Sequence, residues 1–260
     1  METRLDEIAD GIYRISRHLH DVTPQAPQGM TVSQFVVLAE EPLLFHLGMR
    51  SGFPDLVSAL RRLLPLPRLR WLSFGHVEAD ECGALSLMMA AAPYSQVAVG
   101  EAGPPGSVRD LCDRPFRSLA PGDAIDLGGR RVVQVPTPHA PHNREAQVLY
   151  EETTKTLLCG DLFTQLGRGP AVTTGDLVEA ALDAETTCPT AAPGPAVPAA
   201  LRALATLRPR TVATMHGSAF EGDGAAALTG LADGWEARFS GPGPDDSGLA
   251  VGGRVISDHA

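Results

Sequence analysis

The chain has 260 residues, of which 43 % are hydrophobic, and carries a formal net charge of −10 at pH 7; that apolar content is enough for the core of a large domain. The acidic balance argues against nucleic acid or an anionic membrane as a partner, because phosphate groups are bound by basic patches. No run approaches the roughly 20 apolar residues of a membrane span, and the first residues lack a signal pattern, so we expect a cytoplasmic protein.

The first hundred residues alternate between strand and helix patterns. Apolar runs with period-two alternation predict strands over residues 11–19, 30–40, 42–48, 69–76 and 95–100. Helical spacing predicts helices over residues 53–65 and 80–93, which separate the last three of these strands. Strands separated by a helix cannot form a tight hairpin, so this part indicates parallel β-α-β order.

The second half returns to hairpins before its helices. Residues 118–138 predict a hairpin that turns at Gly128 and Gly129, and residues 146–161 predict another. Helices are expected over residues 175–185, 200–209 and 225–239, with a short strand over 211–217. Two β-rich blocks, each followed by helices, indicate one internally duplicated sandwich over residues 1–240, with a flexible polar tail at 241–260.

Three side chains of ligand type follow the strand predicted at 69–76. His76, Glu78 and Asp80 alternate by two positions, which puts their side chains on one face of an extended segment. Imidazole nitrogen and carboxylate oxygen are metal ligands, and a cation would relieve the repulsion between the two carboxylates. The alternative is a solvated acidic turn that caps the following helix.

Three further predicted strands end in residues of the same kind. His139 and His142 follow one strand, Asp161 follows the next, and His216 follows the last. Ligands in α/β folds gather at the carboxyl ends of strands, so we expect these side chains to meet the first three. The combined pattern favours a metal site over an acidic turn.

The order of these motifs resembles the metallo-β-lactamase superfamily. The matching features are HxExD at 76–80, a histidine near a Pro-rich turn, GD at 160–161 followed by two apolar residues, and a strand that ends in HG at 216–217. The resemblance extends over roughly residues 8–236. It implies an α/β (α+β) fold, the four-layer αββα sandwich of that superfamily.

The glutamate at position 78 indicates which members of this superfamily the sequence resembles most. Hydrolases of the superfamily usually carry histidine there, whereas glutamate is typical of the flavodiiron proteins and of related oxygen-binding di-iron proteins. The resemblance implies two metal ions, in the first place iron, with zinc or manganese as alternatives. One ion would be held by His76, Glu78 and His142 and the other by Asp80 and His216, with Asp161 as the bridge.

Carboxylate-rich ligand sets suit metals that change oxidation state. Hard anionic oxygens favour iron or manganese and compensate the charge gained when ferrous ions become ferric. We therefore expect a site that binds or reduces dioxygen or nitric oxide. Two alternatives stay open: a metal-dependent hydrolase of a phosphoester, thioester or lactone, and a non-catalytic oxygen or iron sensor.

Two positions depart from the flavodiiron pattern. Glu81 stands where those proteins commonly carry histidine, and is a candidate second-metal ligand, a hydrogen-bond acceptor behind a ligand, or only the start of a helix. His139 is an extra histidine, interpreted as a turn residue or as a donor near the open side of the site. The isolated His46 is expected in the core, and His18 and His20 at the surface.

Flavodiiron proteins also carry an FMN-binding domain. Only 44 residues follow His216 (260 − 216), too few for such a domain, so we expect no flavin in this chain. Catalytic reduction would then draw electrons from a separate donor protein. Proteins of this fold often form homo-oligomers, although the sequence shows no interface.

Overall fold

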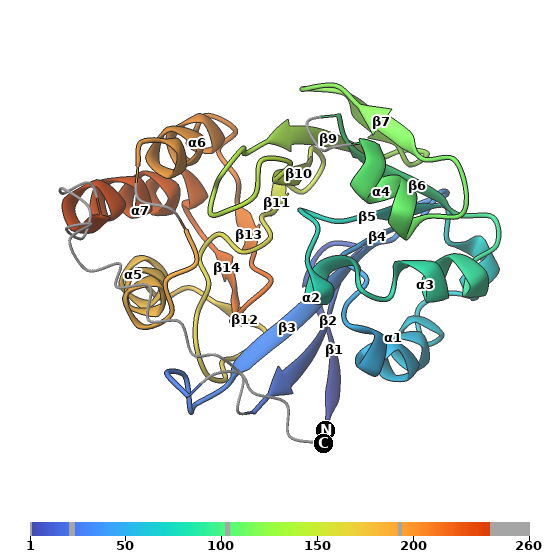
Figure 1. Ribbon diagram of the computed structural model, residues 1–260, viewed down its shortest axis with the longest axis horizontal. Coiled ribbons are helices and arrows are strands. Elements are labelled where there is room, and N and C mark those ends of the chain that lie inside the picture. Colours follow the sequence, from blue (N-terminus) through green and yellow to red (C-terminus); the bar gives the residue numbers. More distant parts are fainter. Residues whose placement is uncertain (1, 21–23, 102–104, 192–193, 240–260) are drawn as a thin grey trace, which may run out of the picture.

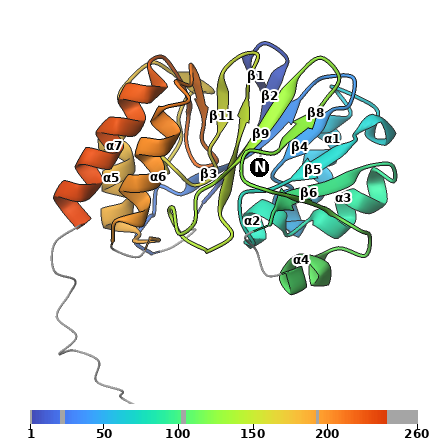
Figure 2. The same ribbon diagram turned by 90° about the horizontal axis from the view of Figure 1, so that it is seen from above.

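Two sheets pack face to face between two groups of helices, which confirms the predicted αββα sandwich (Figures 1 and 2). The computed structural model describes residues 2–20, 24–101, 105–191 and 194–239. The tail predicted at 241–260 lies outside these residues. Within them, no helix is long and apolar enough to cross a bilayer.

The first sheet has seven strands in sequential order. They are β1 (Thr3–Ala9), β2 (Ile12–Leu19), β3 (Met30–Val37), β4 (Leu43–Phe45), β5 (Trp71–Ser73), β6 (Gln96–Gly100) and β7 (Arg117–Leu119). Neighbours from β1 to β4 are antiparallel, and those from β4 to β7 are parallel. The β-α-β order predicted for this part is confirmed.

The second sheet also has seven strands, in the order β12-β14-β13-β11-β10-β9-β8. Their bounds are β8 (Ala124–Asp126), β9 (Arg131–Pro136), β10 (Gln147–Glu151), β11 (Thr156–Leu158), β12 (Val172–Thr173), β13 (Thr211–Ala213) and β14 (Ala219–Glu221). Both predicted hairpins, β8–β9 and β10–β11, are present. Because β11 and β13 pair in parallel, the loops that follow them start side by side.

Helices cover the outer face of each sheet. The first group is α1 (Phe53–Leu60), α2 (Ala79–Cys82), α3 (Leu85–Ala91) and α4 (Pro105–Leu111); the second is α5 (Val178–Thr187), α6 (Ala196–Ala205) and α7 (Gly224–Phe239). The single helix predicted over 80–93 is wrong, because the chain breaks between α2 and α3. There the backbone N–H of Ala84 donates to Gly48 O in the loop after β4.

The apolar core forms three layers. Fully buried side chains such as Phe35, Phe45 and Leu149 fill the space between the sheets, and separate clusters lie under α1–α3 and under α5–α7. β3 is buried along nearly its whole length because both of its faces are covered. This rigid sandwich holds the loops at one edge, where the candidate site lies.

Candidate metal centre

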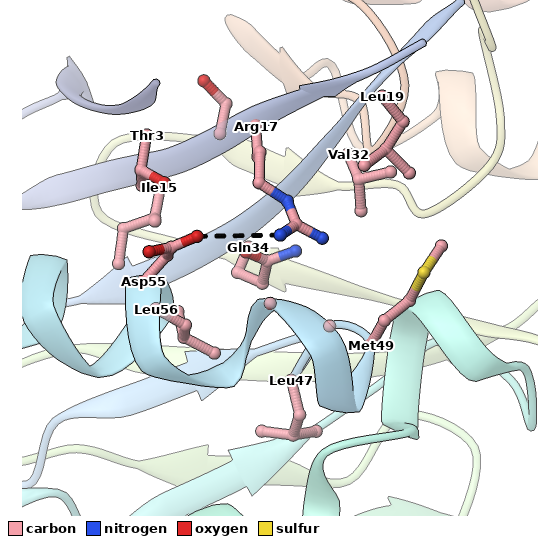
Figure 3. Close-up of a pocket in the computed structure, with 13 residues that line it drawn as sticks. Thr3, Ile15, Arg17, Leu19, Val32, Gln34, Leu47, Met49, Asp55 and Leu56 are labelled. Atoms are coloured by element: carbon pink, nitrogen blue, oxygen red, sulfur yellow. Dashed lines mark ion pairs between the residues drawn. The ribbon is translucent and has the colours of Figure 1, made fainter. Parts of the chain in front are cut away.

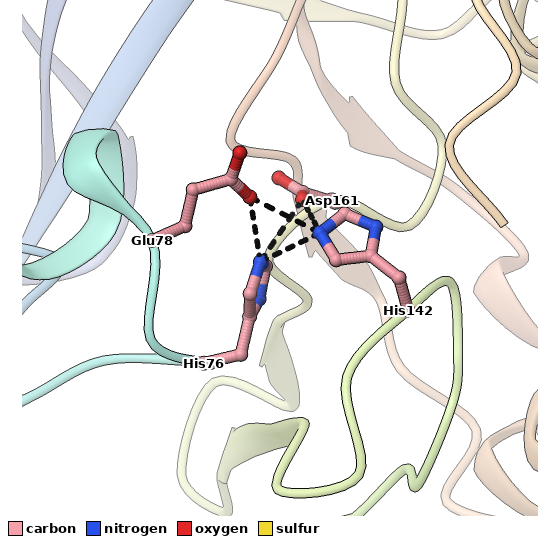
Figure 4. Close-up of side chains that lie close together, drawn as sticks. All are labelled: His76, Glu78, His142 and Asp161. Atoms are coloured by element: carbon pink, nitrogen blue, oxygen red, sulfur yellow. Dashed lines mark hydrogen bonds and ion pairs between the residues drawn. The ribbon is translucent and has the colours of Figure 1, made fainter. Parts of the chain in front are cut away.

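Four segments of the chain bring all six of the predicted ligands to one edge of the sandwich. His76, Glu78 and Asp80 follow β5, His142 lies between β9 and β10, Asp161 follows β11, and His216 follows β13. Figure 4 shows how four of these side chains point toward one another, with His76 and Glu78 on one segment and His142 and Asp161 on two others. The first sheet supplies three of the six residues and the second sheet supplies the other three.

One group of donors surrounds the carboxylate of Glu78. Glu78 Oε2 lies 2.8 Å from His76 Nε2 and 3.1 Å from His142 Nε2, and the two Nε2 atoms are 2.8 Å apart. One ligand atom from each of His76, Glu78, His142 and Asp161 lies within 4.8 Å of the others. Such convergence of imidazole nitrogens and carboxylate oxygens is the geometry of a metal site.

Asp161 joins this group to a second one. Its Oδ2 lies 3.6 Å from His76 Nε2 and 3.5 Å from His142 Nε2, while its Oδ1 lies 3.1 Å from His216 Nε2. Asp80 Oδ2 is 3.5 Å from the same His216 nitrogen. Each carboxylate oxygen of Asp161 therefore faces a different group of donors.

Two of the histidine rings make contacts through their Nδ1 atoms. His216 Nδ1 lies 2.9 Å from the carbonyl oxygen of Thr31, and His76 Nδ1 lies 3.2 Å from Glu81 Oε1. A hydrogen bond at Nδ1 fixes the tautomer that leaves Nε2 free as a ligand. No sequence pattern indicated Thr31, because its contribution is a main-chain oxygen.

The carboxylate of Glu81 lies against His76. Its side chain is 0 % exposed and accepts a hydrogen bond of 2.6 Å from the backbone N–H of His76. Gly75 permits this approach, because a Cβ there would lie 2.9 Å from both carboxylate oxygens. His46, buried as predicted, has Nε2 at 3.5 Å from Glu81 Oε1, a contact that its apolar strand context did not indicate.

The other histidines that the structure describes lie outside this centre. His139 is exposed, has a φ of 63° and donates its backbone N–H to Asn143 O, so it takes the predicted role of a turn residue. The surface position predicted for His18 is wrong: it is 7 % exposed and packs edge-to-face on His20, with the ring centroids 4.7 Å apart.

The pKa values of the candidate ligands reflect a surplus of negative charge among them. Burial alone would lower the pKa of His76, but hydrogen bonds to Glu78 and Glu81 raise that pKa to about 11. Burial would also lower the pKa of His216, but the carboxylates Asp161 and Asp80 outweigh burial and raise that pKa to about 9. Burial raises the pKa of Asp80 to about 6. In the metal-free chain, imidazolium groups supply the positive charge that the carboxylates require.

The donors fit a pair of cations. One group offers two imidazoles and two carboxylates, and the other offers one imidazole and two carboxylates, with Asp161 shared. Asp161 Oδ1 is buried and, apart from its ion pair of 3.1 Å with His216 Nε2, has no hydrogen-bond partner among the described residues, as expected of an oxygen that can accept a cation. Metal ions would replace the imidazolium protons and satisfy this oxygen together.

A cavity of about 170 Å³ adjoins these donors. Its floor includes Glu78, Asp80, His142, Asp161 and His216, and its walls are mainly apolar. A smaller cavity of about 20 Å³ lies beside α1, where Arg17 and Asp55 form an ion pair of 3.6 Å (Figure 3). The described residues around that smaller cavity include no histidine or cysteine.

Comparisons with known proteins agree with this architecture. No family model matches the chain. A curated relative, the putative diflavin flavoprotein A 3 of Synechocystis sp., is 26 % identical over 141 residues, which are 52 % of this chain and 24 % of that protein. The chain thus spans about a quarter of that relative's length.

Solved structures show which fold this is. A fragment of the putative diflavin flavoprotein A 5 of Nostoc sp. has a TM-score of 0.79 at 18 % identity, covering 91 % of this chain and 96 % of the fragment. The rubredoxin oxygen:oxidoreductase of Desulfovibrio gigas has a TM-score of 0.74 at 19 % identity, covering 89 % of this chain and 60 % of that one. The chain has the metallo-β-lactamase-like fold of the flavodiiron core, which confirms the predicted resemblance.

Proposed function

We propose that this chain is a di-iron oxidoreductase that binds or reduces dioxygen or nitric oxide with electrons from an external donor. The observation that carries the proposal is the position of Glu78, whose carboxylate contacts both His76 Nε2 and His142 Nε2. Two histidines and one carboxylate around an open position are the donors typical of non-haem iron that reacts with oxygen. The similarity to an oxygen oxidoreductase supports the same chemistry.

Each donor has a defined part in this proposal. His76, Glu78 and His142 would hold one iron, Asp80 and His216 the other, and Asp161 would bridge them. When bound, a ferrous pair supplies the electrons that a diatomic gas accepts. The chain's own carboxylates offset the extra charge of the oxidised pair, and Glu81 and Thr31 keep two imidazoles in the ligand tautomer.

The electrons would come from a separate protein. A ferrous pair that has passed its electrons to a gas must be reduced again, so sustained turnover would need a partner that reduces the centre after each cycle. Assembly into a homo-oligomer is a further part of the proposal, in keeping with the fold.

Oxygen uptake by the iron-loaded protein tests the proposal. Metal-free protein would be loaded with ferrous iron under anaerobic conditions, freed of excess iron and mixed with aerated buffer in an oxygen electrode. Two electrons per ferrous pair correspond to one dioxygen reduced to peroxide or half a dioxygen reduced to water. Glu78→Gln is the matched variant, because this side chain is 50 % exposed and the fold should tolerate the change.

We expect Glu78→Gln to lose both bound iron and oxygen uptake. Zinc that iron does not displace, together with turnover of a phosphodiester, thioester or lactone that disappears in Asp80→Ala, would instead establish the hydrolase.

A further inference from the structure

A separate cleft is lined by residues of β1, β2 and β3 and by Arg168 and Gly169. Its lining includes two further arginines, Arg4 and Arg14, but none of the six proposed metal ligands. The volume of this cleft is about 20 Å³, which is room for one water molecule or for one oxygen atom of a larger group. The rest of such a group would lie in solvent, beside the exposed side chains of Arg4 and Arg168.

Arg14 is a buried cation of this cleft. Its side chain is 3 % exposed and forms no ion pair with a described residue. Three of its five N–H groups donate to Ser33 Oγ and to the carbonyl oxygens of Ala171 and Gly217. Burial lowers the pKa of Arg14 to about 10, against the attraction of Asp6 on the neighbouring strand. Because a buried charge is costly unless it is compensated, an anion in the cleft would stabilise this guanidinium.

The charges around the cleft favour an anion. Arg4 and Arg168 are exposed, and neither forms an ion pair with a described residue. Two carboxylates oppose the three arginines, that of Glu2 in the lining and that of Asp6 beside Arg14. These groups sum to one positive charge (3 − 2), on a chain whose net charge is −10. The cleft therefore attracts anions, although the chain as a whole repels them.

His18 adds a buried hydrogen-bond acceptor to the cleft lining. It is 7 % exposed, its ring forms a hydrogen bond with the backbone of Gln28, and its Nδ1 has no hydrogen-bond partner among the described residues. Burial, together with Arg168 and His20, lowers the pKa of His18, so the ring is neutral and carries its proton on Nε2. A neutral ring of this tautomer accepts a hydrogen bond at Nδ1. A ligand that fits the cleft must therefore accept from arginines and also donate one proton.

We propose that this cleft binds hydrogen phosphate, an oxyanion that keeps a hydroxyl group at neutral pH. The hydroxyl would occupy the closed part of the cleft and donate to His18 Nδ1, and the other oxygens would accept from the three arginines. Sulfate has the same shape but no proton at neutral pH, so one of its oxygens would face the lone pair of His18. The inference goes beyond the proposed function, because no candidate metal ligand takes part in it.

Calorimetric titration of the metal-free protein with phosphate and with sulfate tests this preference. Both anions would be added at pH 7 and at equal ionic strength, and the absence of metal keeps them from binding to zinc or iron. We expect phosphate to bind saturably and at least about tenfold more tightly than sulfate, because only phosphate satisfies the buried acceptor of His18.

Two variants localise the binding. Arg168→Gln removes one guanidinium and should weaken phosphate binding at least about tenfold. Arg61→Gln is the matched control, at an exposed arginine that follows α1 and forms no ion pair with a described residue. His18→Phe should abolish the preference for phosphate over sulfate. Should His18→Phe fail to fold, the preference of the unmodified chain tests the same acceptor.

Three results would overturn the inference: no saturable binding of phosphate, equal affinities of the unmodified chain for phosphate and sulfate, or equal phosphate affinities of Arg168→Gln and Arg61→Gln. Because every titration uses metal-free protein, a failure of the iron proposal leaves these results unaffected.

Discussion

The carboxylate of Glu81 contacts His76 on the side of the candidate centre and His46 on the side of the core. It meets the backbone N–H and Nδ1 of His76 on one side and lies 3.5 Å from His46 Nε2 on the other. Burial lowers the pKa of His46, so a neutral imidazole faces Glu81 from the core side. The acidic charge of Glu81 is thus directed at His76 and strengthens it as a ligand.

Glu81→Gln should weaken metal binding without removing any proposed ligand. The amide keeps the size of the side chain but loses the charge that orients and polarises His76, and changes of this kind cost about 10–100-fold in metal affinity. Competition with a chelator would measure the loss. Glu152→Gln, at a half-exposed glutamate that pairs with Arg131, is the control; equal affinities of the two variants would contradict the role given to Glu81.

Metal binding should release protons and strengthen as pH rises. With pKa values of about 11 and 9, His76 and His216 carry protons at pH 7 in the metal-free chain, and a metal must displace them. Affinity should fall further as pH drops through about 6, where Asp80 becomes protonated. Calorimetry in buffers of different ionisation enthalpy would detect the protons; identical heats in all buffers would contradict this account.

At the level of elements, patterns along the chain predicted what depends on local sequence. The hairpins β8–β9 and β10–β11 and the helices α5 and α7 follow from turn residues and periodicity. The break between α2 and α3 did not, because Ala84 leaves the helix for a backbone bond to Gly48, far away in sequence. The short strands β12 and β14, at one end of the second sheet, also lack a strong local pattern.

In the candidate site, too, some features follow from local sequence and others depend on distant contacts. Its six proposed ligands were predictable because each lies just beyond a strand whose end is visible in the sequence. The partners Thr31 and His46, and the cavity wall from α5 and α7, depend on how distant segments pack. Sequence patterns therefore predict the candidate ligands, whereas tertiary packing determines which residues contact those ligands and line the cavity.

The turn between β5 and α2 should depend on Gly75. In Gly75→Ala the new Cβ would lie 2.9 Å from both oxygens of the buried Glu81 carboxylate, which must then shift. We expect a loss of about 1–3 kcal/mol in the free energy of unfolding, measured by urea denaturation. Gly230→Ala in α7 is the control and should cost less, because its Cβ would lie 3.3 Å from Val178 Cγ2, a longer contact than those at Gly75; equal stability of both variants would refute the steric argument.

At the scale of the whole molecule, the candidate centre joins the two halves of the sandwich, and in the proposed assignment its two metal positions would have unequal donors. Asp161 adds one oxygen to each position. With that oxygen, His76, Glu78 and His142 make four donors, whereas Asp80 and His216 make three.

Metal should therefore load in two steps. The position with four donors should fill first, and the position with three should bind at least about tenfold more weakly, which corresponds to about 1.4 kcal/mol. Titration of the metal-free protein with zinc, followed by calorimetry, would separate the two steps. A single step that fills both positions with equal affinity would contradict the unequal donor sets.

The central claim is that the two positions hold iron that changes oxidation state. The most direct measurement is elemental analysis of protein expressed with iron and purified without oxygen, followed by its visible spectrum as air is admitted. We predict two irons per chain and a new charge-transfer band on oxidation. Zinc that iron cannot displace, with a spectrum indifferent to air, would contradict it.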